Sequence, residues 1–246
     1  MSKLIAITGK GGVGKTTVSA LLIKHLIASG AGPVLAIDAD PNSCLDAALG
    51  VQVSHTVGRA REEVRETVSA GASVSKQELL HLKIEEGLVE AAGFDLIAMG
   101  RPEGPGCYCY ANNVLKSVIA EISAQYTSVV LDNEAGLENL SRRIVQKVDL
   151  MVLVSDASDA GLRTLGRLYE LSREMGMEYG RLALVVNRLR GAEPPERFRA
   201  LQVSTGADIA LALPDDTQLA QFAEQNRSLL TLPEDNAVYR LVGRLV

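Results

Sequence analysis

Short apolar runs alternate with longer segments of helical periodicity along this chain of 246 residues. Most of the runs are nearly continuous Val, Ile, Leu and Ala, which is typical of strands buried on both faces of a parallel sheet. The pattern predicts seven strands, at residues 3–8, 34–38, 94–99, 128–132, 150–155, 182–187 and 209–213. Helix-length segments lie between them, among them residues 15–28, 112–125, 137–147 and 162–175. This alternation predicts a single domain over residues 1–246 of the doubly wound α/β class, with a mostly parallel sheet of about seven strands flanked by helices.

The stretch 54–93 departs from that alternation. It contains no convincing strand and predicts two charged amphipathic helices, about residues 55–68 and 75–91, separated by a break rich in Ser, Ala and Gly. We therefore expect a helical insertion between two strands. The tail, residues 235–246, predicts a closing helix whose apolar positions form one stripe, which favours packing on the core over membrane anchoring.

Composition narrows the class of protein. The net charge is −5 and aromatic residues make up 4% of the chain, with no Trp, which argues against a nucleic-acid binder that works by positive charge or base stacking. No apolar run approaches the about 20 residues that span a bilayer. Three cysteines are too few for a secreted disulfide scaffold. We expect a cytoplasmic protein that binds no nucleic acid and no membrane stably.

A phosphate-binding loop follows the first predicted strand. Its sequence, Gly-Lys-Gly-Gly-Val-Gly-Lys-Thr, matches the pattern G-x-x-x-x-G-K-[ST] between a strand and a helix. Glycines let successive backbone N–H groups point at phosphate oxygens, and the positive end of the next helix faces the same place. We expect Lys15 to contact the β- and γ-phosphates and the Thr16 hydroxyl to ligate Mg²⁺. The predicted nucleotide-binding residues of this P-loop are Gly9, Lys10, Gly11, Gly12, Val13, Gly14, Lys15, Thr16 and Thr17.

Lys10 is not needed to cradle phosphates within one chain. With it, residues 10–17 resemble the deviant P-loop of the MinD, ParA and nitrogenase-iron-protein group of P-loop ATPases. In that group the matching lysine reaches across a dimer to the partner's nucleotide. The resemblance implies that Lys10, like Lys15, is catalytic, and that a homodimer forms through the nucleotide face so that dimerisation and hydrolysis are coupled. A solvated loop lysine is the alternative.

Two acidic segments follow in the order that the resemblance implies. The strand ending in Ile-Asp-Ala-Asp-Pro-Asn carries Asp38 and Asp40 and resembles the group's switch I, and Asp132 and Gly136, in Leu-Asp-Asn-Glu-Ala-Gly, resemble its Walker B strand and switch II. By resemblance, Asp38 and Asp132 lie at Mg²⁺ or its waters. Asp40 orients or deprotonates the attacking water, and the Gly136 N–H senses the γ-phosphate. Each acid taken alone fits an ordinary strand-end carboxylate or N-cap equally well.

Three later residues resemble the group's base site. Asn187 ends the run Leu-Val-Val-Asn and resembles the adenine-contacting Asn, and Pro214 and Asp216, in Leu-Pro-Asp-Asp, resemble the loop that packs on the base. No N-K-x-D guanine signature is present, so ATP is favoured over GTP. Such strand ends and turns are also routine loop chemistry.

Cys107 and Cys109 form a C-x-C pair in a turn rich in Pro and Gly. Thiolates are soft donors that suit zinc, nickel, copper(I) and iron–sulfur clusters. One pair supplies two ligands and a closed site takes four, so a second chain across a two-fold axis would complete it. This is the dimer that Lys10 implies. Idle thiols and a redox disulfide are the alternatives, and we expect Cys44 to be a small packed residue.

The C-x-C segment narrows the resemblance. Residues 40–45 and 99–110 resemble those of CooC-type ATPases, which serve nickel insertion into carbon monoxide dehydrogenase and acetyl-CoA synthase. The resemblance implies an ATP-hydrolysing metallochaperone, with ATP and Mg²⁺ as cofactors. Its ATP-bound dimer would hold Ni²⁺ between Cys107 and Cys109 of both chains, and Zn²⁺ would fit the same site. An apo form of either enzyme would be the client.

Two other functions stay open. The first is an iron–sulfur electron-transfer ATPase like the nitrogenase iron protein. That family has a cysteine after switch II, and residues 136–140 here contain none, although a C-x-C dimer could still hold a cluster. The second is a ParA- or MinD-like partitioning or positioning ATPase, which would need a basic patch that faces DNA or a membrane helix.

Overall fold

The computed structural model describes residues 2–69, 76–101, 122–136 and 147–246. Within them, eight strands form one sheet in the order β3-β4-β2-β5-β1-β6-β7-β8. All neighbours are parallel except β3 and β4. The strands are β1 (Lys3–Gly9), β2 (Val34–Asp38), β3 (Val89–Ala91), β4 (Phe94–Ala98), β5 (Ser128–Ala135), β6 (Lys147–Asp156), β7 (Glu178–Leu189) and β8 (Ile209–Pro214). The predicted doubly wound α/β class is confirmed.

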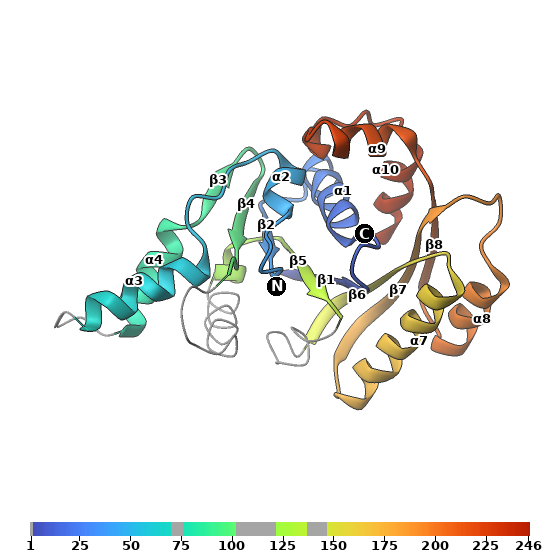
Figure 1. Ribbon diagram of the computed structural model, residues 1–246, viewed down its shortest axis with the longest axis horizontal. Helices are drawn as coiled ribbons and strands as arrows, with labels where there is room; N and C mark the ends of the chain where they lie inside the picture. The colour runs from blue at the N-terminus through green and yellow to red at the C-terminus, as the bar shows by residue number, and fades with distance from the viewer. Residues whose placement is uncertain (1, 70–75, 102–121, 137–146) are drawn as a thin grey trace.

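Helices cover both faces of this sheet (Figure 1). One apolar core packs α1 (Lys15–Ala28), α2 (Leu45–Leu49), α9 (Thr217–Glu224) and α10 (Ala237–Val242) against the sheet. The other contains residues of α3 (Val57–Ser69), α4 (Lys76–Glu86), α7 (Asp159–Glu174) and α8 (Glu196–Thr205). Short 3₁₀ helices span Ser123–Gln125, Leu229–Thr231 and Gly243–Leu245.

The central strands serve both cores at once. Along β1, Ile5 and Ile7 belong to the core around α1, while Ala6 between them belongs to the opposite one. Successive strand residues face opposite sides of a sheet. Since both sides are covered, every position must be apolar, which explains the continuous apolar runs in the sequence.

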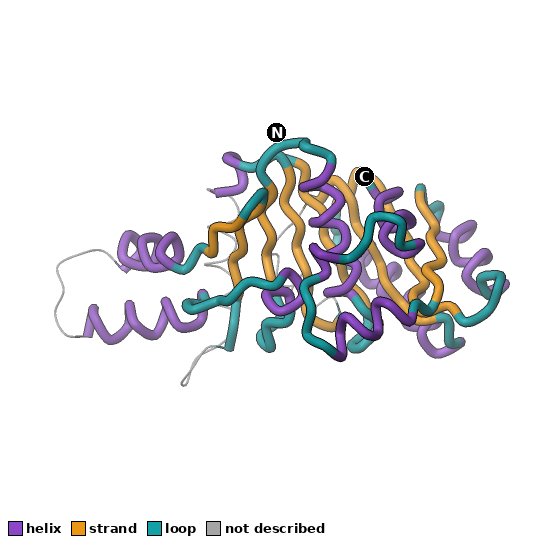
Figure 2. The backbone as a smooth tube through the Cα atoms, turned by 90° about the horizontal axis from the view of Figure 1, so that it is seen from above, coloured by secondary structure: helices purple, strands orange, loops and turns teal. Residues whose placement is uncertain are grey.

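The helical insertion is present, with one correction. Helices α3 and α4 pack on each other and project beyond the edge of the sheet (Figure 2). The expectation that the stretch 54–93 holds no strand is wrong, because α4 ends at Glu86 and β3 then pairs antiparallel with β4. Gly93, with φ of 88°, lies in the tight turn between them. A strand of three residues is too short to show an alternating pattern.

Other element boundaries differ modestly from the predictions. Strands β6 and β7 begin earlier than predicted, at Lys147 and Glu178. Their first residues include polar, exposed positions, which are not part of the apolar runs on which the prediction rests. The predicted helices 112–125 and 137–147 lie largely outside the described residues. The tail forms α10 and a 3₁₀ turn. Of its predicted apolar stripe, Val238, Val242 and Leu245 are buried and Leu241 is partly buried against the same core. In the described part of the chain, no helix is long and apolar enough to cross a membrane.

Candidate functional site

Predicted site residues gather where neighbouring parallel strands end. Strand β5 lies between β1 and β2, and the register places Asp38 directly opposite Asp132. Asp132 also pairs with Ile7, just before the P-loop. Because the carboxyl ends of parallel strands meet at one edge of a sheet, segments more than a hundred residues apart along the chain share one site.

Glycines shape the loop between β1 and α1. Gly12 and Gly14 adopt φ values of 76° and 93°, a region that residues with a Cβ disfavour. A Cβ on Gly9 would lie 2.1 Å from the carbonyl oxygen of Val154, so β1 and β6 approach closely there. Helix α1 begins at Lys15 without a side-chain cap. Its first N–H groups and positive dipole end are therefore directed at the concave side of the loop, where an anion would bind.

The two loop lysines lie in opposite environments. Lys15 is 8% exposed, and its ammonium donates to the carbonyl oxygen of Lys10 at 3.4 Å. The Lys10 side chain is exposed. The pKa of Asp156, at the end of β6, is lowered first by a hydrogen bond with Ser158 and further by the positive charges of Lys10 and Arg188. The Lys10 side chain is therefore open to solvent, while Lys15 is held inside the loop.

Asp38 organises the chain that follows β2. Its carboxylate accepts backbone N–H groups from Asp40 at 3.0 Å, from Cys44 at 2.9 Å and from Leu45 at 2.9 Å. The side chain is 1% exposed. Burial raises its pKa to about 6, against the lowering effect of these hydrogen bonds. The expectation that Cys44 is packed is wrong, because this residue is exposed. Cys44 contacts Asp38 through its backbone N–H.

Asp132 is the second buried carboxyl group and is less well satisfied. It is 1% exposed, and its Oδ1 has no hydrogen-bond partner among the described residues. Burial, followed by the charge of Asp38, raises its pKa to about 7, while Thr16, Ser19 and Lys15 act in the opposite direction. An unpartnered carboxylate oxygen beside a hydroxyl and a second carboxyl group is a donor set that suits a hard divalent cation. The residues present therefore fit Mg²⁺.

Three polar side chains that follow β2 and β4, those of Asp40, Asn42 and Arg101, are linked by hydrogen bonds. Asp40 accepts from the backbone N–H of Asn42 at 2.8 Å and from its side-chain amide at 3.0 Å. The Asn42 Oδ1 in turn accepts from the guanidinium of Arg101. Arg101 follows β4 and precedes the segment with Cys107 and Cys109, and both cysteines lie outside the described residues. The described residues contain no group of three or more His, Cys, Asp or Glu side chains arranged to hold a metal ion.

The end of β5 is fastened to the P-loop. The Gly136 N–H donates to the carbonyl oxygen of Gly9 at 2.9 Å, and the Thr8 hydroxyl donates to the carbonyl oxygen of Gly136. Gly136 has φ of 89°, and a Cβ placed on it would meet no atom of the described residues within 4 Å. The N–H group predicted to sense the γ-phosphate is thus bonded to the P-loop itself, and it would have to leave Gly9 to contact a nucleotide.

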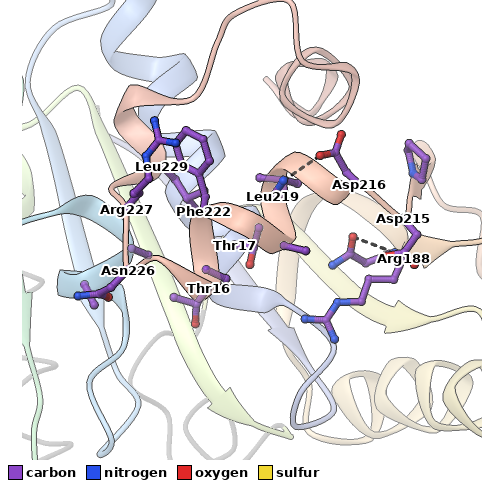
Figure 3. Close-up of a pocket in the computed structure, with 16 residues that line it drawn as sticks. Thr16, Thr17, Arg188, Asp215, Asp216, Leu219, Phe222, Asn226, Arg227 and Leu229 are labelled. Carbon is purple, nitrogen blue, oxygen red and sulfur yellow. Dashed lines mark hydrogen bonds between the residues drawn. The ribbon is translucent and has the colours of Figure 1, made fainter.

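A cavity of about 310 Å³ adjoins the start of α1 (Figure 3). This volume lies within the range of about 300–1,000 Å³ that is common for small-molecule sites. Residues of α1, α2 and α9 line it, together with the ends of β7 and β8. The three predicted base residues, Asn187, Pro214 and Asp216, all line it alongside Thr16 and Thr17. The structure therefore brings the base residues together, next to the P-loop.

Asn187 also supports the P-loop. Its amide donates to the carbonyl oxygen of Val13 at 2.9 Å, and its Oδ1 accepts the N–H of Arg188 at 3.0 Å. Arg188 has φ of 56°, and its guanidinium donates to the carbonyl oxygen of Gly12 at 3.2 Å. Arg188 was not predicted as a site residue. Its position directly after Asn187 was the one signal in the sequence.

Comparison with known proteins assigns the family. Residues 2–179 match the model of an AAA domain. The chain belongs to this AAA-domain family. An uncharacterized ATP-binding protein of Methanocaldococcus jannaschii is 41% identical over 98% of this chain and 96% of its own length. The carbon monoxide dehydrogenase accessory protein CooC of Rhodospirillum rubrum is 30% identical over 90% of this chain and 86% of its own length.

Solved structures agree with the family assignment at the level of fold. A ParA family ATPase from Chlorobium tepidum superposes with a TM-score of 0.74 and 18% identity, covering 99% of this chain and 96% of its own. The cell division ATPase MinD of Pyrococcus furiosus gives 0.70 and 18%, over 100% of this chain and 97% of its own. With its complete P-loop motif, this AAA-domain protein is a P-loop ATPase.

Proposed function

We propose that this ATPase is a metallochaperone that forms a nucleotide- and metal-dependent homodimer. Ni²⁺ is its cargo, held between Cys107 and Cys109 of two chains, and the client is an apo form of carbon monoxide dehydrogenase or acetyl-CoA synthase. The observation that carries the proposal is the 30% identity with the carbon monoxide dehydrogenase accessory protein CooC over 90% of this chain. The C-x-C pair supplies the soft donors that such a cargo requires.

Hydrolysis in this proposal is phosphoryl transfer to water, which depends on positioning and charge stabilisation. Lys15 exchanges the carbonyl oxygen of Lys10 for phosphate oxygens, and Lys10 reaches the nucleotide of the partner subunit. Asp40 orients the attacking water. Mg²⁺, bound by Thr16 together with the two buried aspartates described above, supplies neutralising charge at the phosphates.

Switch I supplies a route from the nucleotide to the thiols. Asp40 holds Asn42, and Arg101 donates to Asn42 immediately before the segment that carries the cysteine pair. When Asp40 changes partners on ATP binding, the anchor of that segment changes too. ATP gates the metal in this way because it favours the dimer that aligns four thiolates, and hydrolysis removes that preference.

Metal binding by defined variants tests the proposal. Light scattering and nickel titration with and without Mg·ATP should give one Ni²⁺ per two wild-type chains and a shift to dimer. Cys107→Ser/Cys109→Ser should lose both, while Cys44→Ser, which removes the exposed thiol outside the proposed site, should keep both. Equal nickel binding by the double variant would overturn the shared thiolate site.

Arg101→Ala tests the route separately. The variant should hydrolyse ATP and bind Ni²⁺ when each is measured alone, but the nickel affinity should no longer depend on Mg·ATP. Arg59→Ala, which removes an exposed arginine that pairs within α3, is the matched control and should keep the dependence. If Arg101→Ala keeps it as well, coupling runs elsewhere.

A positioning ATPase is the second candidate. The septum site-determining protein MinD of Bacillus subtilis is 28% identical over 77% of this chain and 66% of its own length. Co-sedimentation with anionic vesicles or with DNA in the presence of Mg·ATP separates the two functions. ATP-dependent pelleting by wild type and by the double cysteine variant alike, without nickel binding, would favour positioning.

A further inference from the structure

Asn236 is a buried polar residue that no part of the predicted site includes. It is 7% exposed. Its Oδ1 accepts the backbone N–H groups of Val238 at 2.9 Å and Tyr239 at 3.0 Å, which caps α10. Its Nδ2 donates to Asp216 Oδ2 at 3.0 Å and to Gln218 Oε1 at 3.0 Å. Because backbone N–H groups only donate, the oxygen must face α10 and the nitrogen must face Asp216.

Asp216 uses its other oxygen on the cavity wall. Its Oδ1 accepts the N–H of Leu219 at 2.8 Å and so caps α9, as the dashed line in Figure 3 shows. One carboxylate therefore joins the start of α9 to the start of α10. Asp216 and Leu219 both line the cavity, together with Pro214 at the end of β8. Any displacement of Asp216 moves this wall.

The segment before α10 is fastened to the P-loop helix. Lys24 on α1 is 9% exposed and donates to the carbonyl oxygen of Leu232. The Lys24 ammonium also lies 4.7 Å from the centre of the Tyr239 ring. Helix α10 packs against α1 (Figure 1). Residues 232–239 thus connect the helix that begins at the P-loop with the wall of the cavity.

We propose that Asn236 is a positioning residue for the nucleotide base. Through Asp216 it holds the Pro214–Leu219 wall at a fixed distance from α1, while the phosphates bind at the start of that same helix. A ligand that spans both places binds tightly only if both are already in position, because ordering them on binding costs affinity. This inference rests on the proposed base site and does not depend on the metal.

An exchange of side chains isolates the contact. Asn236→Asp keeps an oxygen for the α10 cap but turns a second carboxylate oxygen toward Asp216. Adding Asp216→Asn restores an amide–carboxylate hydrogen bond with its direction reversed, and both residue types are good N-caps. The pair therefore changes the contact twice while both helix caps remain.

Inorganic tripolyphosphate has no base, so comparing its binding with that of ATP separates a role at the base from a merely structural role of Asn236. We expect Asn236→Asp to weaken ATP binding about tenfold, as for a lost hydrogen bond to a charged group, with kcat and the inhibition constant of inorganic tripolyphosphate unchanged. Because Asp216 itself lines the cavity, the exchanged pair is compared with both single variants, and it should bind ATP more tightly than either Asn236→Asp or Asp216→Asn. Equal loss for ATP and tripolyphosphate, or no recovery in the pair, would overturn the inference. Asn236→Ser, which keeps a cap without the repulsion, replaces Asn236→Asp if that variant does not fold.

A cavity-filling variant separates this inference from the base site. Leu219→Trp should weaken ATP but not tripolyphosphate if the base occupies the cavity. If it does so while Asn236→Asp leaves ATP unchanged, the base site stands and the positioning role is wrong. If neither variant affects ATP, the base lies elsewhere and both ideas fail.

Discussion

The phosphate half of the site is held by the backbone, whereas the base half is held by side chains. In the first, strand register sets Asp38 opposite Asp132 and a close approach of β1 to β6 leaves room at Gly9 for no side chain. In the second, single amide groups on Asn187 and Asn236 join segments that lie far apart in the chain. A clash in a close backbone contact displaces whole strands, whereas the loss of one side-chain contact leaves the other contacts in place. Disruption should therefore cost more in the phosphate half.

The largest effect should come from Lys15. In the proposed mechanism, Lys15→Met removes the charge that neutralises the β- and γ-phosphates, so ATP turnover should fall about 10³-fold. Phosphate release measures it. Lys10→Met is the comparison variant. Its side chain is exposed, so the affinity for ATP, measured by titration, should persist in this variant while turnover is lost. Turnover by Lys15→Met within tenfold of wild type would contradict the placement of this residue.

Gly9→Ala should be the next most damaging change. The new Cβ would lie 2.1 Å from a backbone oxygen of β6 that cannot move aside alone, and we expect a loss of about 3 kcal/mol in the free energy of unfolding. Gly12→Ala meets no atom within 4 Å and should cost about 1 kcal/mol, from its positive φ alone. Urea unfolding measures both. Equal losses would show that the close approach of the strands is not limiting.

Removing the carboxylate of Asp132 should raise the free energy of unfolding, unlike the two glycine changes, and the gain should depend on pH. Its pKa is raised from 3.8 to about 7 in the fold, so the stability that the neutral form contributes is lost as the pH rises between these values. In EDTA at pH 8, Asp132→Asn should therefore be more stable than wild type by about 2 kcal/mol. This is roughly half of what a shift of about three pKa units gives at about 1.4 kcal/mol per unit, because part of the shift comes from the charge of Asp38, which titrates in the same range. The difference should shrink as the pH falls toward 4. A difference that does not vary with pH would mean that Asp132 is not the titrating group.

The base half should show the smallest effect. Asn187→Ala loses the hydrogen bond to Val13 and the one from Arg188, and we expect about 1 kcal/mol of destabilisation with a raised KM for ATP. Asn187→Asp keeps the acceptor for Arg188 and loses the donor to Val13, so it separates the two contacts. Thermal melts and ATP titration measure the outcome. A loss as large as that of Gly9→Ala would remove the contrast between the two halves.

The same contrast explains what the sequence could predict. The P-loop and the buried strands follow from local pattern. The meeting of Asp38 with Asp132 is implied by the resemblance to the deviant P-loop ATPases, and it agrees with the rule that parallel strand ends share an edge. The pairing of Asn236 with Asp216 joins two elements through side chains, and neither residue carries a local mark of it. β3 is too short for a periodic signal, and neither the exposure of Cys44 nor the hydrogen bond from its backbone N–H to Asp38 is marked in the local sequence. Local signals specify elements, while side-chain bridges require the assembled fold.

The order of the strands has a consequence for synthesis. β1 and β2 are made first, yet β5, made about ninety residues later, lies between them. Until β5 emerges from the ribosome, the facing edges of β1 and β2 have no partner, and such edges invite pairing with other chains. A growing chain also lacks Asp132, so it carries the P-loop without the residue opposite Asp38. The residues that line the cavity extend to Leu229. Stabilisation by bound nucleotide therefore reaches only a nearly finished chain, and the early strands must be kept apart by other means.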